Sequence, residues 1–408
     1  MPQTQRWFGE QGTAFTNAFA TTPLCCPSRA SILTGRYAHN HAVRNNADAM
    51  SLDQRSTLQY YLHEAGYRTA IAGKFLNEWD LGVKPPFFDR WAVFRDHLNY
   101  YGVDFNVDGT IKTVGGYSTH FVESQALRFL GDFERNDHRP WLLYVAPLAS
   151  HKPFTPEPKY ADASVSSKPL SPAVLEEDLS DKPPFLQDPE LGSKGARVTR
   201  RRQLRTLMSA DDMVGRLMSQ LRRFDELEDT LAFFLSDNGL LAGEHGLVDK
   251  RLPYTQSAAI PFFVRWDGWV PAGVEDHRLV ANVDVAPTAL AAAGVPPSAR
   301  YPIDGRDLIG PSARAQLFME YFVDPVRPVP DWAAVRTGDA LYTEYYGSDG
   351  SMVFREYYDL LEDPWELNNL LNDRSGKNDP SNPLLARLSQ MVTRARRCIG
   401  TVGRHACP

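Results

Sequence analysis

The chain has 408 residues and a formal net charge of −6, with 43% hydrophobic and 23% charged residues. A chain of this length can bury a large core and is expected to contain two domains, and its composition is that of a globular protein. The acidic balance argues against a general nucleic-acid binder, and no apolar run of about 18 residues indicates a membrane span.

A short strand at residues 13–19 leads to a helix that begins near two adjacent cysteines, because Pro27 suits a first helical turn. A cysteine at a helix start meets free N–H groups and the positive end of the helix dipole, which favour a thiolate or a bound oxyanion. Arg29 adds positive charge one turn further on. Cys25 is therefore a candidate nucleophile. Adjacent cysteines can also form a strained disulfide, bind a metal as a pair or simply pack in the core.

The next three hundred residues alternate between apolar strands and helices. We expect helices at 58–66, 123–134, 198–224 and 283–294, buried strands at 69–72, 141–145, 230–235 and 260–265, and a small hairpin within 86–119. Residues 153–196 are rich in Pro, Ser, Asp and Lys, which indicates an active-site cover or a flexible insert. This alternation predicts an α/β fold with a mostly parallel sheet that helices cover on both faces.

The pattern changes near residue 312. Strands are expected at 317–321, 340–346 and 355–360, followed by a helix at 383–397. We therefore predict a catalytic α/β domain at 1–311 and a smaller antiparallel α+β subdomain at 312–408. Cys398 and Cys407 lie nine positions apart and are predicted to form a disulfide, which would imply an oxidising compartment; two free thiols are the alternative.

Polar residues follow several of the predicted strands. Cys25, Lys74, His151 and Asp237 with Asn238 each come directly after a strand or within a few residues of its end. The carboxyl ends of parallel strands meet at one edge of a sheet, so these side chains are expected to converge. Asp237 and Asn238 offer the hard oxygen ligands that Ca²⁺ or Mg²⁺ prefers, although Ser-Asp-Asn-Gly is also a common metal-free turn.

The run at 24–35, Leu-Cys-Cys-Pro-Ser-Arg-Ala-Ser-Ile-Leu-Thr-Gly, and the Tyr-Ala-His-Asn-His that follows at 37–41 resemble the signature of type I sulfatases. The resemblance is strongest to the N-acetylglucosamine-6-sulfatase and arylsulfatase branch, and residues 358–370 resemble its C-terminal pattern. It implies an alkaline-phosphatase-like fold and a sulfuric ester hydrolase that cleaves a sugar or aryl sulfate. It also implies that a formylglycine-generating enzyme oxidises Cys25 to formylglycine.

The same resemblance assigns roles to individual residues. Cys25, as formylglycine, joins Asp237 and Asn238 in binding Ca²⁺, or Mg²⁺ in its place. Arg29 steadies the formylglycine, and Lys74, His151 and Lys250 contact the sulfate. His151 also assists the leaving group. His245 is a further candidate near the leaving group.

Two features depart from the family pattern. Thr255 stands where the family usually has a glutamate after the tyrosine of K-x-x-x-Y, here Lys250 and Tyr254. The family also has an upstream strand that ends in a calcium-binding Asp-Asp pair, and this chain has no such pair before Cys25. We expect the upstream coding sequence to supply that strand and a signal peptide, since residues 1–6 do not resemble one. The full-length form would then be extracytoplasmic or secreted.

Two other functions remain open from the sequence. One is a phosphonate or phosphate ester hydrolase that shares the fold and the formylglycine. The other is a catalytically defective relative that only binds sulfated glycans.

Overall fold

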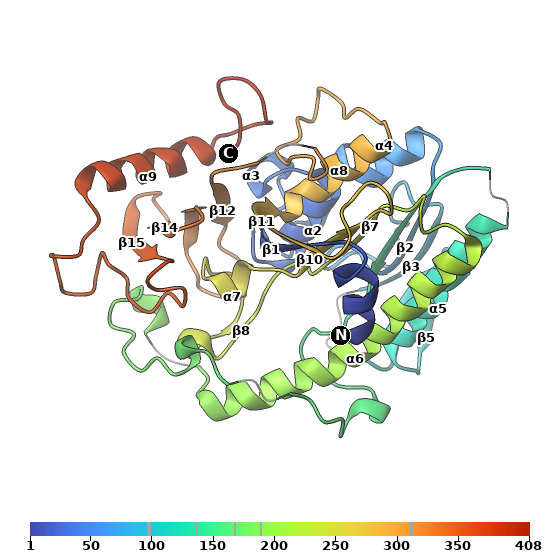
Figure 1. The fold of residues 1–408 in the computed structure, drawn as a ribbon, viewed down its shortest axis with the longest axis horizontal. Coiled ribbons are helices and arrows are strands. Elements are labelled where there is room, and N and C mark those ends of the chain that lie inside the picture. The colour runs from blue at the N-terminus through green and yellow to red at the C-terminus, as the bar shows by residue number, and fades with distance from the viewer. Residues whose placement is uncertain (96–98, 136–137, 167–168, 188–189, 311–312) are drawn as a thin grey trace.

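The computed structural model describes residues 1–95, 99–135, 138–166, 169–187, 190–310 and 313–408. Parts of the predicted hairpin region at 86–119, of the predicted cover at 153–196 and the predicted domain boundary at 311/312 lie outside these residues. The three larger of the four described sheets lie side by side in Figure 1, and the long helix α6, Ser193–Phe224, runs along the lower edge of the molecule in this view.

The first sheet has five strands in the order β5-β4-β3-β2-β6. Its bounds are β2 Arg68–Lys74, β3 Arg90–Phe94, β4 Val103–Val107, β5 Thr110–Val114 and β6 Trp141–Ala146. β2 is parallel to both β3 and β6, whereas β4 and β5 form an antiparallel hairpin on β3. α4, Leu58–Glu64, and α5, Ser118–Glu134, both contact β2.

The second sheet has four strands in the order β11-β1-β10-β7. They are β1 Thr13–Phe19, β7 Ala232–Leu235, β10 Phe262–Arg265 and β11 Val274–Ala281. β1 and β11 are parallel, but β10 is antiparallel to both β1 and β7. The sheet is therefore mixed. The predicted parallel arrangement is interrupted at β10. The connection from β7 to β10 contains no full crossover helix, only the β8–β9 hairpin and the four-residue helix α7, Thr255–Ala258.

A cleft separates these two sheets. β6 ends the first sheet and β7 ends the second, and among the described residues neither strand pairs on its outer edge. Both strands line a cleft of about 1490 Å³, together with the N-terminal helix and α6. Trp141 and Leu143 of β6 pack against the same apolar cluster as Ala232 and Phe234 of β7, yet these strands are only half-buried. The two sheets therefore lie edge to edge, with the cleft between β6 and β7.

The third sheet is an antiparallel meander near the C-terminus. It consists of β12 Leu317–Tyr321, β13 Asp331–Arg336, β14 Ala340–Tyr346 and β15 Met352–Asp359 in that order. α9, Asn382–Ala395, packs on β13 and β14 through a shared apolar cluster. Cys398 and Cys407 are joined by a disulfide that closes the tail behind α9.

α2, Cys25–Thr34, is buried along its whole length and ends at Gly35, whose φ of 67° suits glycine. α8, Val285–Ala292, packs beside it. None of the helices among the described residues is both long and apolar enough to cross a membrane. The remaining short elements are α1 Pro2–Thr4, η1 Gln5–Gly9, α3 Ala38–His41, η2 Ala49–Ser51, η3 Gln54–Ser56, η4 Pro158–Tyr160, η5 Pro172–Val174, η6 Pro184–Leu186, β8 Leu241–Ala242, η7 Glu244–Gly246, β9 Val248–Asp249 and η8 Asn282–Asp284.

Candidate active site

Cys25 is the first residue of α2, and its sulfur contacts a lysine from a distant loop. Nζ of Lys250 lies 2.8 Å from Sγ of Cys25, and both residues are buried. Burial by itself would raise the pKa of the Cys25 thiol, but the charges of Lys250 and Lys74 outweigh it and lower the pKa to about 6. For Cys26, burial outweighs a backbone hydrogen bond at Asn77 and the charge of Lys74, and its pKa is raised to about 12. The two thiols are free, and only Cys25 is placed to act as an anion.

Lys74 is the last residue of β2, and His151 follows the neighbouring parallel strand β6. Gly73 precedes Lys74 with a φ of 112°, and a Cβ there would lie 2.0 Å from the backbone oxygen of Ala146. The glycine therefore permits the close approach of β6 at the point where both strands end. His151 contributes a side-chain hydrogen bond that helps to lower the pKa of Cys25, while its Nδ1 lies 2.9 Å from the backbone oxygen of Lys152.

Arg29 and Asp237 form an ion pair at the bottom of the site. Nε of Arg29 donates to Oδ2 of Asp237 at 2.8 Å, and its Nη1 donates to the backbone oxygen of Lys74 at 2.9 Å. Burial opposes ionisation of Asp237, but Arg29, Lys250 and Lys74 outweigh it and lower its pKa to about 2. Arg29 thus ties the end of β7 to the end of β2 and neutralises a carboxylate that stays ionised.

The loop that carries Lys250 is held by the C-terminal sheet. Asp249 and Arg251 on either side of Lys250 have positive φ values of 104° and 87°, which are unfavourable for residues with a Cβ. Nε of Arg251 donates to Asp324 at 2.7 Å, and the indole of Trp332 donates to the backbone oxygen of Arg251 at 2.7 Å. These contacts, from the loop after β12 and from β13, maintain the strained loop. No local signal in the sequence linked Asp324 or Trp332 to the site.

The residues after Lys250 also connect to the C-terminal part of the chain. The hydroxyl of Tyr254 donates to Glu356 at 2.8 Å, so this tyrosine anchors the loop to β15. The backbone N–H and the hydroxyl of Thr255 donate to Glu366 at 2.9 and 2.7 Å. A carboxylate therefore does lie beside position 255, but it comes from a residue 111 positions further along the chain.

The predicted metal ligands are close together but few. Asp237 and Asn238 follow β7, and Oδ1 of Asn238 is buried without a hydrogen-bond partner, as expected for an oxygen that faces a cation. Ca²⁺ takes six to eight oxygen ligands, and among the described residues no group of three or more His, Cys, Asp or Glu side chains could hold a metal. The donors fit a hard divalent cation in kind, but this set is too small to bind one alone.

Comparison with known proteins identifies the family. A model described as Sulfatase matches residues 1–295, and one described as N-sulphoglucosamine sulphohydrolase, C-terminal, matches residues 243–394. The chain belongs to the sulfatase family. The predicted family is thereby confirmed.

Individual relatives of this sulfatase-family chain agree with that assignment. A putative extracellular sulfatase Sulf-1 homolog of Caenorhabditis elegans is 34% identical over 329 residues, which cover 76% of this chain but only 46% of the relative. The N-acetylglucosamine-6-sulfatase of Homo sapiens is 29% identical, and the match covers 98% of this chain and 81% of the relative.

A solved structure supports the fold of this sulfatase-family chain. It is described as a complex with its substrate D-glucosamine-2-N,6-O-disulfate and is 25% identical to this chain. The TM-score is 0.79, and the match covers 96% of this chain and 91% of that one. The predicted alkaline-phosphatase-like α/β fold is confirmed.

His245 lies outside the cleft lining in this sulfatase-family chain. Its Nδ1 is 2.6 Å from Oε2 of Glu176, and its ring centroid is 4.4 Å from that of Tyr254. Nε2 of His245 is buried without a partner. His245 is therefore fixed by Glu176, a residue from the predicted cover segment that the sequence did not single out.

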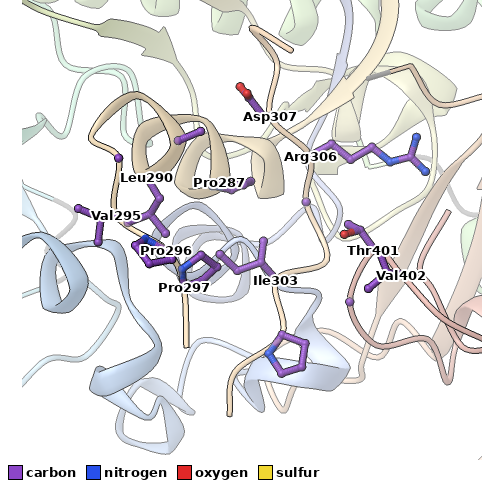
Figure 2. A pocket seen from close by; sticks show the side chains of 15 residues that line it. Pro287, Leu290, Val295, Pro296, Pro297, Ile303, Arg306, Asp307, Thr401 and Val402 are labelled. Carbon is purple, nitrogen blue, oxygen red and sulfur yellow. The ribbon is translucent and has the colours of Figure 1, made fainter. Parts of the chain in front are cut away.

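A second groove, of about 890 Å³, lies between α8, the loop after it and the C-terminal tail (Figure 2). Prolines and aliphatic side chains form most of its wall, with Arg306 and Asp307 beside them. None of the predicted site residues lines it. The cleft between β6 and β7, with Lys74, His151, Asp237, Asn238 and Lys250 on its wall, is the candidate active site.

Proposed function

We propose that this chain hydrolyses the sulfate ester of a sulfated sugar and that Cys25, oxidised to formylglycine, carries the nucleophile. The observation that supports this most directly is the Lys250 ammonium 2.8 Å from Sγ of Cys25, in a buried site that also receives charge from Lys74. Hydrolysis of a sulfate ester needs positive charge around the oxygens that become negative at sulfur. A buried thiolate pocket with two lysines meets that need.

The formylglycine hydrate would supply a hydroxyl that attacks sulfur and a second hydroxyl whose deprotonation releases sulfate. Lys250 and Lys74 would bind the sulfate oxygens and stabilise their charge. His151 would protonate the leaving alkoxide. Its Nδ1 faces a backbone carbonyl, which can only accept, so Nδ1 carries a proton and Nε2 is left to exchange one with the substrate. Arg29 would act by holding Asp237 and the end of β2 in place.

Asp237 and Asn238 would hold a divalent cation, with calcium as the proposed ion. Bound there, the cation would act as a Lewis acid and orient the nucleophile. Because the two residues supply too few oxygens, we propose that the open cleft between β6 and β7 takes one more β-strand from a segment beyond this sequence. Carboxylates at the end of that strand would complete the ligand set. The half-buried faces of β6 and β7 and the free Oδ1 of Asn238 support this.

We also propose that the protein is secreted. Two observations support this: the disulfide between Cys398 and Cys407, and the similarity to a putative extracellular sulfatase. A nonreduced digest of protein exported to the periplasm or the medium should link the peptides that contain Cys398 and Cys407. Free thiols at both positions in exported protein would remove this argument.

The function is tested by expressing the chain, extended by the segment that supplies the added strand, with a formylglycine-generating enzyme and measuring sulfate release from glucosamine 6-sulfate and nitrophenyl sulfate. The tryptic peptide with Cys25 should show by mass spectrometry the loss of sulfur and the gain of an aldehyde, while Cys26 in the same peptide stays unchanged as an internal control. Cys25→Ala should abolish turnover. A faster reaction on matched phosphate or phosphonate esters would favour the phosphonate hydrolase alternative. Tight binding of sulfated glycan without turnover by fully modified protein would favour a defective relative.

A further inference from the structure

The first half of α6 is the most basic stretch of the chain. Residues 193–210 include one lysine, five arginines and no acidic residue, although the whole chain has a net charge of −6. Five of these cations are exposed, and none of the five takes part in an ion pair among the described residues: Lys194, Arg197, Arg200, Arg201 and Arg202. Positive side chains close together on one helix repel one another when no acidic partner is near. A bound anion relieves this repulsion, so such a stretch is suited to attract an anionic ligand.

This stretch lies beside the candidate active site. Arg200 lines the same cleft as His151 and Lys250. One turn earlier, α6 packs closely against the loop that leads to Lys250. A Cβ added to Gly243 in that loop would lie only 2.6 Å from Cβ of Ala196. In Figure 1 the start of α6 lies below β8, the strand that opens this loop.

Three of the exposed cations share one face of the helix. Lys194, Arg197 and Arg201 are spaced by three and four residues, which places them in a row about 10 Å long. We call these three residues the basic stripe. Arg200, one residue from Arg201, lies on the side that lines the cleft, so positive charge continues from the stripe towards the site.

We propose that the basic stripe binds neighbouring sulfate or carboxylate groups of a polysaccharide whose ester sulfate lies at Cys25. The substrate class is then a sulfated polysaccharide rather than an isolated monosaccharide or an aryl sulfate. This inference rests on the proposed function and deepens it. Guanidinium groups bind tetrahedral oxyanions through paired hydrogen bonds, so arginine suits this role better than lysine. Nucleic acid offers similar charge, but the buried site with Lys74 and Lys250 is built for one ester group, which favours the sulfated sugar.

The test compares two triple variants with the same change in charge. The first removes the stripe through Lys194→Gln, Arg197→Gln and Arg201→Gln. The control removes three exposed arginines of α9 and the tail after it through Arg387→Gln, Arg394→Gln and Arg397→Gln. Glutamine keeps helix propensity, and the melting temperature of each variant checks the fold. Binding of a highly sulfated oligosaccharide, its desulfated form and a DNA duplex of similar charge is measured by calorimetry over a range of salt concentrations.

We expect the stripe variant to bind the sulfated oligosaccharide about tenfold more weakly at low salt and with a shallower salt dependence, and the α9 variant to bind like the parent. Binding without sulfation should be weak for every protein. Equal loss in both variants, or no loss in either, would overturn the inference, and so would tighter binding of DNA than of the oligosaccharide. Because these measurements need no turnover, a failure of the proposed hydrolysis would be seen separately.

Discussion

Nζ of Lys250 and Sγ of Cys25 are 2.8 Å apart although 225 residues separate them in the chain. The contact forms only when α2 and the loop after β9 are both in place. It stabilises negative charge at the position of Sγ, whether that charge belongs to a thiolate or to the oxygens that the proposed oxidation would place there.

Lys250→Met should therefore raise the pKa of the unmodified Cys25 thiol from about 6 towards 9.0, because the largest stabilising charge is removed while burial remains. Titration of the thiolate by ultraviolet absorbance, with Cys25→Ala as the blank, measures this pKa. Lys112→Met changes an exposed lysine and should leave the pKa unchanged. An unshifted pKa in Lys250→Met would show that the 2.8 Å contact does not control the thiol.

Asp237 should make the native state sensitive to acid. Its folded pKa of about 2 lies below its ordinary value of 3.8, so the ionised form stabilises the fold above the ordinary pKa. That contribution is lost as the pH falls from about 4 towards 2. Asp237→Asn should be less stable near neutral pH, because Arg29 is left without its carboxylate, and its stability should change less over this pH range. Urea unfolding of both proteins between pH 6 and pH 3 checks this; parallel pH profiles would contradict it.

Asp324 should affect the active site from a distance. Asp324→Asn weakens the buried pair with Arg251, which should destabilise the protein by about 3 kcal/mol and free the strained loop around Lys250. In Asp324→Asn we expect a lower melting temperature together with a higher Cys25 pKa, since Lys250 is no longer held at the thiol. Arg128→Gln in α5 breaks a half-exposed pair with Asp108 and is the matched control. A stability loss without any change in the pKa would limit Asp324 to a structural role.

Features of the fold and the site could be predicted from the sequence when they depend on residues that are close together in the chain. Cys25, Lys74, His151 and Asp237 each follow an apolar strand, and the rule that parallel strands place their ends at one edge predicted that they converge. The supports for Lys250 could not be predicted in this way. Asp324 and Trp332 are fixed to Arg251 by tertiary contacts alone, and nothing in their sequence neighbourhood encodes that pairing.

The ends of elements were harder to predict than their existence. α5 begins at Ser118 rather than 123, and α6 at Ser193 rather than 198, because polar first turns carry no apolar periodicity. The predicted sheet was mostly parallel, and β10 is an exception to it, because its short connection to β7 permits an antiparallel pair. Glu176 was missed as the partner of His245 because a Pro-rich and Ser-rich segment gives no periodic signal.

The cleft between β6 and β7 predicts that an added strand changes metal binding. Extending the chain upstream to include an apolar strand that ends in two aspartates should confer calcium binding, measured by calorimetry, and protect amides of 141–146 and 232–235 from hydrogen exchange. Replacing both aspartates by asparagine should keep the protection and lose the calcium. Tight calcium binding by the chain that starts at Met1 would contradict this proposal, and so would unprotected strand edges in the extended protein.

The burial of α2 limits when the proposed oxidation of Cys25 can occur during biosynthesis. All ten residues from Cys25 to Thr34 are buried, and Cys25 is 2% exposed, so an oxidising enzyme cannot hold this segment in the folded protein. The segment is accessible from its emergence from the ribosome until α2 docks beneath residues synthesised more than two hundred positions later. The fraction of chains that carry the modified Cys25 should therefore depend on the rate of the enzyme relative to the rate of folding. Slower folding, as at a lower expression temperature, should increase the aldehyde content without any change in the active site itself.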